Sequence, residues 1–150
     1  MIALPGQLPP PLRALATGAG LQFLKFGTVG TVGFLIDTAT VYALRHSTGL
    51  YAAGILAYLL AASANWALNR AWTFRGRGHA AAYRQWLRFV AVNTIGFVAN
   101  RGTFVALITL VPLCATVPVL AVAAGAIAGM LLNFALSRAL VFPEPTIAAS

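Results

Sequence analysis

An aspartate lies inside an apolar run that is long enough to cross a bilayer. Asp37 stands within residues 22–44, QFLKFGTVGTVGFLIDTATVYAL, and Glu144 is the other acid of the 150-residue chain. A carboxylate inside a membrane helix costs several kcal/mol unless it is paired or hydrated. Arg101 stands at a similar depth in a later apolar run. The sequence therefore predicts either a structural Asp37–Arg101 ion pair or a polar centre along a substrate path.

Basic residues and side-chain amides recur near one end of the apolar runs. Arginine presents a planar fork of donors that matches phosphate, so a lipid phosphate is one hypothesis for the ligand. Snorkelling and membrane topology also account for basic residues at such positions. The candidate binding residues are Lys25, Asp37, Asn65, Asn69, Arg70, Arg88, Asn100, Arg101, Asn133 and Arg138.

The sequence shows no set of residues for catalysis or for metal binding. It contains no serine–histidine–acid arrangement, no pair of carboxylates and no cluster of metal ligands. Cys114 is the only cysteine, in an expected loop, so neither an intramolecular disulfide nor a Cys-based metal site is expected. We therefore expect a protein that is not an enzyme and needs no cofactor.

The composition indicates an integral membrane protein. The chain is 60% hydrophobic and 8% charged, whereas soluble domains are about 25% charged. Backbone groups in a bilayer must be satisfied internally, so apolar segments of more than about 20 residues are expected to be helices. Four such segments are predicted at 23–44, 50–72, 86–110 and 117–140.

The distribution of basic residues predicts the orientation. The net charge is +8, but most basic residues lie at the ends of apolar runs, so topology explains them better than a nucleic-acid partner does. Positive residues stay cytoplasmic. Both termini and the middle loop, 74–85, are expected inside, and the short connections at 45–49 and 111–116 outside. Residues 1–20 are expected to be a flexible cytoplasmic tail, and residues 21–145 a membrane domain.

The chain contains an internal repeat. Residues 85–107 align with 22–44 without a gap, and NFALSRALVF at 133–142 matches NWALNRAWTF at 65–74. Repeat one covers about 22–75 and repeat two about 85–143. Each holds two helices, which predicts an all-α fold of two parallel repeats. Stripes of small or polar residues, such as Gly27–Gly30–Gly33, are expected to pack helix against helix. Asp37 corresponds to Asn100, so the two repeats differ at this position.

Several motifs resemble the GtrA-like membrane proteins. They are LKFGTVGTVGFLID, NRAWTFR, the RF start of the second copy and NFALSRALVF, within residues 23–142. The resemblance implies a four-span protein of bacterial surface-polysaccharide pathways that flips, or helps to flip, polyprenyl-phosphate-linked sugars, commonly beside a glycosyltransferase. It places Asp37, Asn69, Arg70, Asn133 and Arg138 at motif positions of the family.

The first functional hypothesis is a translocase for a polyprenyl-phosphate-linked sugar. Four helices make a thin wall for such a path, so a homo-oligomer is expected. The second hypothesis is a scaffold that docks a glycosyltransferase and moves nothing. The third is a small proton-coupled multidrug exporter, which Arg101 disfavours because it would repel cations.

Overall fold

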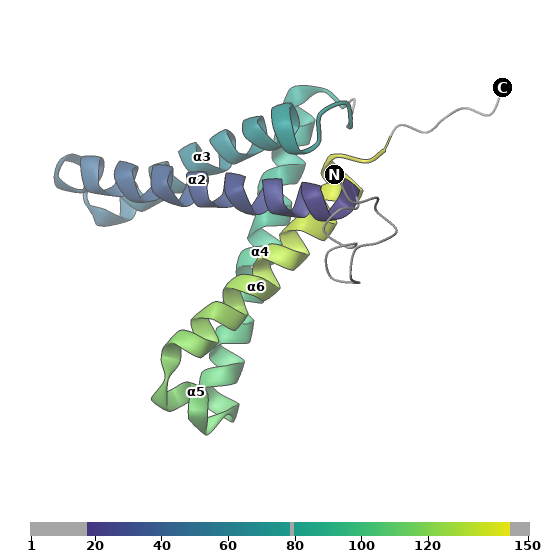
Figure 1. Cartoon of the computed structure of the whole chain (residues 1–150). Coiled ribbons are helices and arrows are strands. Elements are labelled where there is room, and N and C mark those ends of the chain that lie inside the picture. The colour runs from purple at the N-terminus through teal and green to yellow at the C-terminus, as the bar shows by residue number, and fades with distance from the viewer. Residues whose placement is uncertain (1–17, 79, 145–150) are drawn as a thin grey trace, which may run out of the picture. The chain divides into compact units, whose positions relative to one another are not determined.

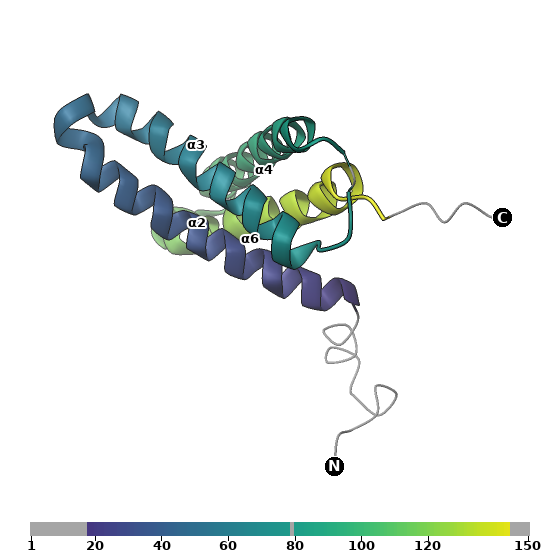
Figure 2. The same cartoon turned by 90° about the horizontal axis from the view of Figure 1, so that it is seen from above.

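The computed structural model describes residues 18–78 and 80–144 as helices and short connections, and these residues form no strand. Figures 1 and 2 show two pairs of long helices that lie side by side, α2 with α3 and α4 with α6. Both second helices end in a π-helical turn. The elements in order are α2 (Gly18–Thr48), α3 (Leu50–Leu68), η2 (Asn69–Thr73), α4 (Ala82–Leu110), α5 (Pro112–Thr116), α6 (Pro118–Leu136) and η3 (Ser137–Val141).

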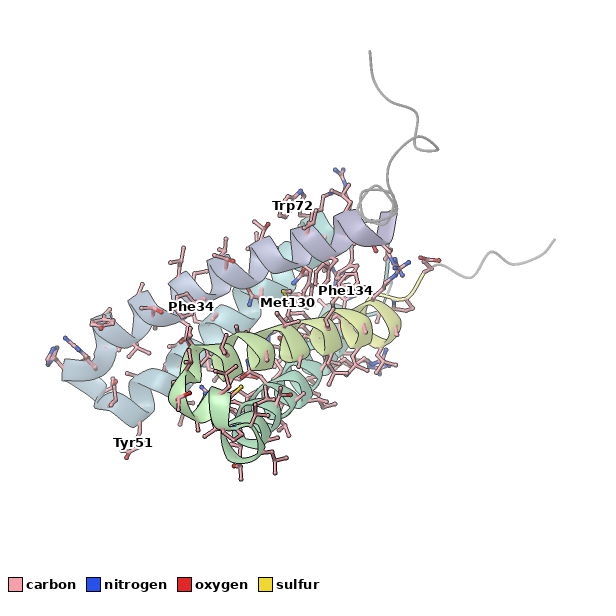
Figure 3. All side chains as sticks on the ribbon, turned by 60° about the horizontal axis from the view of Figure 1, so that its bottom comes forward. Phe34, Tyr51, Trp72, Met130 and Phe134 are labelled. Atoms are coloured by element: carbon pink, nitrogen blue, oxygen red, sulfur yellow. The ribbon has the colours of Figure 1, made fainter. Side chains whose placement is uncertain are left out.

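Within residues 18–78 and 80–144, four helices are long and apolar enough to cross a membrane: Gly18–Thr48, Leu50–Thr73, Ala82–Leu110 and Pro118–Val141. Large apolar side chains project from them into the surroundings. Phe34 on α2 and Tyr51 on α3, both labelled in Figure 3, are 67% and 92% exposed. Such surfaces suit lipid or other protein, not water. The prediction of an all-α integral membrane protein with four spanning helices is confirmed.

The chain divides into two compact units, one ending at Arg75 and the other beginning at Gly76. Each unit is an antiparallel pair of long helices, α2 with α3 and α4 with α6 (Figure 1). In the first unit, Gly49 alone connects the two helices, with φ of 81°. A residue with a Cβ is strained at that angle.

Small residues at every fourth position hold each pair together. In the second unit, a Cβ built on Gly125 would lie 2.6 Å from the carbonyl oxygen of Asn100. One built on Gly129 would lie 2.9 Å from the carbonyl oxygen of Gly96. The backbones of α4 and α6 therefore approach as closely as glycine permits, which is how helices associate in lipid. In the first unit Ala53, Ala57 and Ala61 are buried at the corresponding positions of α3.

The expected glycine stripe on α2 is wrong at one position. A Cβ on Gly33 would meet the Asn65 side chain, whereas one on Gly30 would have no atom within 4 Å. Each helical residue advances about 100° around the axis, so a spacing of three drifts off the packed face and a spacing of four stays nearer to it. The small residues of α3 and α6 are four apart and therefore stay on the face that packs against the partner helix.

The connections differ from the predicted ones. The predicted turn at 45–49 is helical up to Thr48, whose hydroxyl, like that of Ser47, donates to the carbonyl oxygen of Leu44. The predicted loop at 111–116 contains α5, begun by Pro112 at its first position, where the missing N–H costs nothing. Cys114 is buried in this short helix. Helix α2 begins at Gly18, inside the predicted tail, and the rest of that tail lies outside the described residues.

We predict that Gly125→Ala lowers the free energy of unfolding by about 1–3 kcal/mol, because the added methyl group overpacks the contact with the Asn100 carbonyl oxygen. Gly102→Ala on α4 is the matched control, since nothing lies within 4 Å of its added Cβ. The control should be neutral or stabilising by up to about 1 kcal/mol from helix propensity. Unfolding in mixed detergent micelles measures both. Equal values for the two variants would contradict the proposed contact.

Candidate functional site

The same π-helical turn ends the second helix of each unit. The N–H of Phe74 donates to the carbonyl oxygen of Asn69, and that of Phe142 to the carbonyl oxygen of Ser137, both at 2.8 Å. Each bond spans five residues instead of four and so widens the helix locally. Single π turns inside helices are frequent at functional sites. They occur here at repeat-equivalent positions, directly at Arg70 and Arg138.

An aromatic pair fixes each π turn against the first helix of its unit. The rings of Phe26 and Phe74 are 6.2 Å apart and inclined by 60°. The rings of Phe89 and Phe142 are 6.3 Å apart and inclined by 66°. Edge-to-face packing of this kind is favourable beyond the area it buries. The repeat seen in the sequence is thus also a repeat of geometry, at the end of each unit where the basic residues gather.

Several buried polar atoms on the second helices have no hydrogen-bond partner among the described residues. A buried acceptor or hydroxyl without a partner costs about 1–3 kcal/mol. Buried polar groups are nearly always satisfied, so a cluster of exceptions indicates a ligand, water or another function. In the first unit these atoms are Asn65 Oδ1, Asn69 Oδ1 and Thr73 Oγ1, and in the second Asn133 Oδ1 and Ser137 Oγ.

Asn65 and Asn133 lie where the opposing helix has a glycine. A Cβ on Gly33 would overlap the Asn65 amide, and one on Gly96 would overlap the Asn133 amide. Both asparagines therefore contribute to helix packing. The sequence predicted them as binding residues, and the structure brings each to the stripe that continues into Asn69 or Ser137.

Two cations gather at the π turn of the first unit. The Lys25 ammonium lies 5.5 Å from the centre of the Trp72 ring, and the Arg70 guanidinium 5.6 Å from that of Trp66. Trp72 is labelled in Figure 3. Aromatic faces attract such cations, so each basic side chain has a defined place on a tryptophan ring, and Arg70 directly follows Asn69, which is almost completely buried.

The second unit holds its cations differently. Leu140 stands at the position of Trp72, and Arg88, which corresponds to Lys25, is exposed. Arg138 instead donates to the Glu144 carboxylate, with Nη2 to Oε1 at 3.3 Å. The Arg77 Nη1 approaches the same oxygen at 3.1 Å. Neither Arg77 nor Glu144 was among the binding residues that the sequence predicted.

Hydrogen bonds between distant segments hold Arg77 in place. Its Nε donates to the carbonyl oxygen of Phe142 at 3.0 Å. The N–H of Gly78 donates to Pro143, and the buried Gln85 donates Nε2–H to Gly78 and Val141. Gly76 and Gly78 on either side both have positive φ, a conformation that glycine adopts without strain. The sequence Gly76–Arg77–Gly78 could have indicated a tight connection that fixes the position of this arginine.

These contacts surround a shallow hollow of about 360 Å³ in the second unit. The side chain of Arg77 is 10% exposed. Burial lowers the pKa of Arg77; Glu144 acts in the opposite direction, and Arg138 adds to the lowering. A guanidinium with its usual pKa above about 12 stays charged through such a change. The hollow is lined by Arg77, Ala135, Arg138, Ala139, Pro143 and Glu144.

Asn100 packs against the opposing helix. The functional roles of Asp37 and Arg101 stay predictions. The Asn100 Cβ and carbonyl oxygen lie against Gly129 and Gly125. Asp37 has the equivalent position on α2 and is half-buried. Arg101 is exposed, with its guanidinium 5.6 Å from the Phe97 ring one turn earlier. Because Asp37 and Arg101 belong to different units, their pairing stays a prediction.

Comparison with known proteins decides the family. The family model for the GtrA/DPMS transmembrane domain matches residues 25–142, which include both π turns and both helix pairs except the first residues of α2. The chain belongs to this family. Membership confirms the resemblance and indicates a role in processes that involve glycosyl lipids. GtrA-like proteins are generally non-catalytic membrane proteins.

A search among curated proteins finds no match. Residues 18–78 and 80–144 contain no group of three or more potential metal ligands.

We predict that Ser137→Ala stabilises the protein by about 1 kcal/mol, because it removes a buried hydroxyl without a partner. The matched control is Ser63→Ala, whose hydroxyl donates to the carbonyl oxygen of Leu59 at 2.7 Å. This control should not gain stability. Thermal unfolding in detergent provides the measurement. A loss of stability in Ser137→Ala would show that the hydroxyl is satisfied in the folded protein.

Proposed function

We propose that this chain translocates a polyprenyl-phosphate-linked sugar across the bacterial cytoplasmic membrane for cell-surface polysaccharide synthesis. One observation carries the proposal. In each unit an arginine, Arg70 or Arg138, directly follows a buried residue, Asn69 or Ser137, at a π turn. The side-chain oxygen of that residue has no hydrogen-bond partner among the described residues. Arginine suits the phosphate. The unpartnered amide and hydroxyl oxygens suit the hydroxyl groups of a sugar, which can donate hydrogen bonds to them.

The orientation in the proposal follows from charge. Lys25, Arg70 and Arg138 lie near the ends of spanning helices that we place on the cytoplasmic side, with both termini. The lipid would be loaded there through its phosphate. The sugar would then pass along the polar stripes of the second helices, while the apolar chain stays in the bilayer. The protein makes and breaks no covalent bond in this scheme, needs no cofactor and binds no nucleic acid.

Two partners belong to the proposal. A glycosyltransferase would produce or consume the lipid-linked sugar. A second copy of the chain would complete the path, since the spanning helices leave many large apolar side chains exposed.

We predict that Arg70→Gln and Arg138→Gln each lower the flipping rate by about tenfold, because each removes a charge-assisted contact worth about 1.5–3 kcal/mol. The assay follows a short-chain polyprenyl-phosphate glucose in proteoliposomes. Arg45→Gln is the control, since Arg45 lies at the opposite end of α2 over the Tyr42 ring. Ser137→Ala should also lower flipping despite its gain in stability.

Other outcomes of this assay would contradict the proposal. If the wild-type protein moves no lipid but retains a glycosyltransferase in the membrane, the chain is a scaffold. Proton-driven efflux of a cationic dye, without lipid movement, would identify an exporter. Equal rates for Arg45→Gln and the two other arginine variants would remove these arginines from the path.

We predict that Asp37→Asn lowers flipping by about tenfold while the protein stays folded. Asparagine already occupies the equivalent position in the second unit, where Asn100 packs against glycines, so the change keeps the size and removes the charge. An intramembrane acid is a functional residue by default. Asp37→Glu, which keeps the charge, should retain more activity than Asp37→Asn. Full activity of Asp37→Asn would reduce the aspartate to a packing residue.

A further inference from the structure

We infer that Arg77 and Arg138 form a phosphate-binding subsite, and that the Glu144 carboxylate holds the place of the phosphate until one displaces it. The inference deepens the proposed function and rests on it for the nature of the lipid. Neither Arg77 nor Glu144 was among the residues that the sequence pattern assigned to the site. Both line the hollow of the second unit.

The geometry is that of an anion site. Two guanidinium groups from segments about 60 residues apart in sequence converge on a single oxygen, Oε1 of Glu144, at 3.1 and 3.3 Å. Charge-assisted hydrogen bonds to carboxylate and to phosphate use the same donor geometry. A phosphate offers further oxygens, so it can engage both guanidinium groups at once without sharing one acceptor atom.

The two sides of the contact differ in how firmly they are held. Arg77 is 10% exposed and is fixed by the bond from Nε to the Phe142 carbonyl oxygen. Glu144 is 67% exposed and lies after the last helix. Exposed ion pairs contribute little to stability, because water and salt screen them. The arginine is therefore pre-organised and the carboxylate can leave at small cost.

Charge also favours displacement. Two guanidinium groups face one carboxylate, so the contact keeps a net positive charge. The surrounding groups are the apolar side chains Ala135, Ala139 and Pro143, which do not neutralise it. In the first repeat the residue aligned with Glu144 is Gly76. An acid at this position therefore distinguishes the second repeat, where it regulates access to Arg138.

The test measures binding of farnesyl phosphate to the full-length protein in detergent by native mass spectrometry. Glu144→Gln removes the competing charge and should bind about two- to fivefold more tightly than the wild type, as expected for loss of an exposed pair. Adding Arg77→Gln or Arg138→Gln to Glu144→Gln should abolish this increase in affinity for farnesyl phosphate. Arg75→Gln in the same background is the matched control, because Arg75 is exposed and lies outside the hollow.

A second arm identifies the source of the phosphate. Inorganic phosphate is titrated against bound farnesyl phosphate in the wild type and in Glu144→Gln. Weak competition at millimolar concentration supports a lipid headgroup as the ligand. Competition as strong as that of the lipid supports the subsite but assigns it to free phosphate.

Two results would overturn the inference. One is equal affinity of the wild type and Glu144→Gln. The other is equal loss of affinity in the Arg77→Gln and Arg75→Gln variants. If Arg77→Gln fails to fold, Glu144→Gln still tests the inference, because it replaces an exposed side chain and should fold normally. Tighter binding in Glu144→Gln without flipping by the wild type would refute the proposed function alone. Flipping without any effect of Glu144 on binding would refute this inference alone.

Discussion

Close backbone approach between two helices is the constraint on which each unit depends. Inside a bilayer the hydrophobic effect does not drive helices together, so association rests on packing and on polar contacts. Gly125 and Gly129 admit the backbone of α4 at Asn100 and Gly96. The next residues of α6 at the same four-residue spacing are Asn133 and then Ser137, where the π turn begins. Packing thus determines which polar atoms become buried and which arginine lies at the end of the stripe.

The two units share this construction and differ in their polar residues. The edge-to-face phenylalanine pairs and the π-turn hydrogen bonds agree closely between the units. Around them Asn69 corresponds to Ser137, Trp72 to Leu140, and Gly76 to Glu144. Lys25 and Arg70 lie on tryptophan rings, whereas Arg138 lies on a carboxylate. Duplication preserved the helix contacts and left the polar positions to diverge, as expected if they serve different parts of one substrate.

Buried oxygens without partners reduce stability, and proteins keep such features where function requires them. Asn69 and Ser137 are both almost completely buried, each directly before its arginine. A lipid-linked sugar has a phosphate for the arginine and hydroxyl groups for the oxygens. In the second unit Arg77 pairs with Glu144, and the first repeat has a glycine, Gly76, at the position of this acid.

The sequence by itself determined the class, the four spans, the repeat and the family. Bilayer thickness and the need to satisfy every backbone group leave few solutions for long apolar segments. The binding roles of Lys25, Arg70 and Arg138 remain predictions that the geometry supports. The sequence wrongly put Gly30 on the packed face of α2, where the structure has no atom within 4 Å of a Cβ added to it. A glycine pattern shows periodicity but not which face meets the partner helix. Only the tertiary structure decided that Gln85 and Arg77 donate hydrogen bonds to carbonyl oxygens at the end of η3 and just after it, and that Arg77 pairs with Glu144. That contact joins segments far apart in the chain, and the path of the connection between helices, set by glycines at positive φ, brings them together.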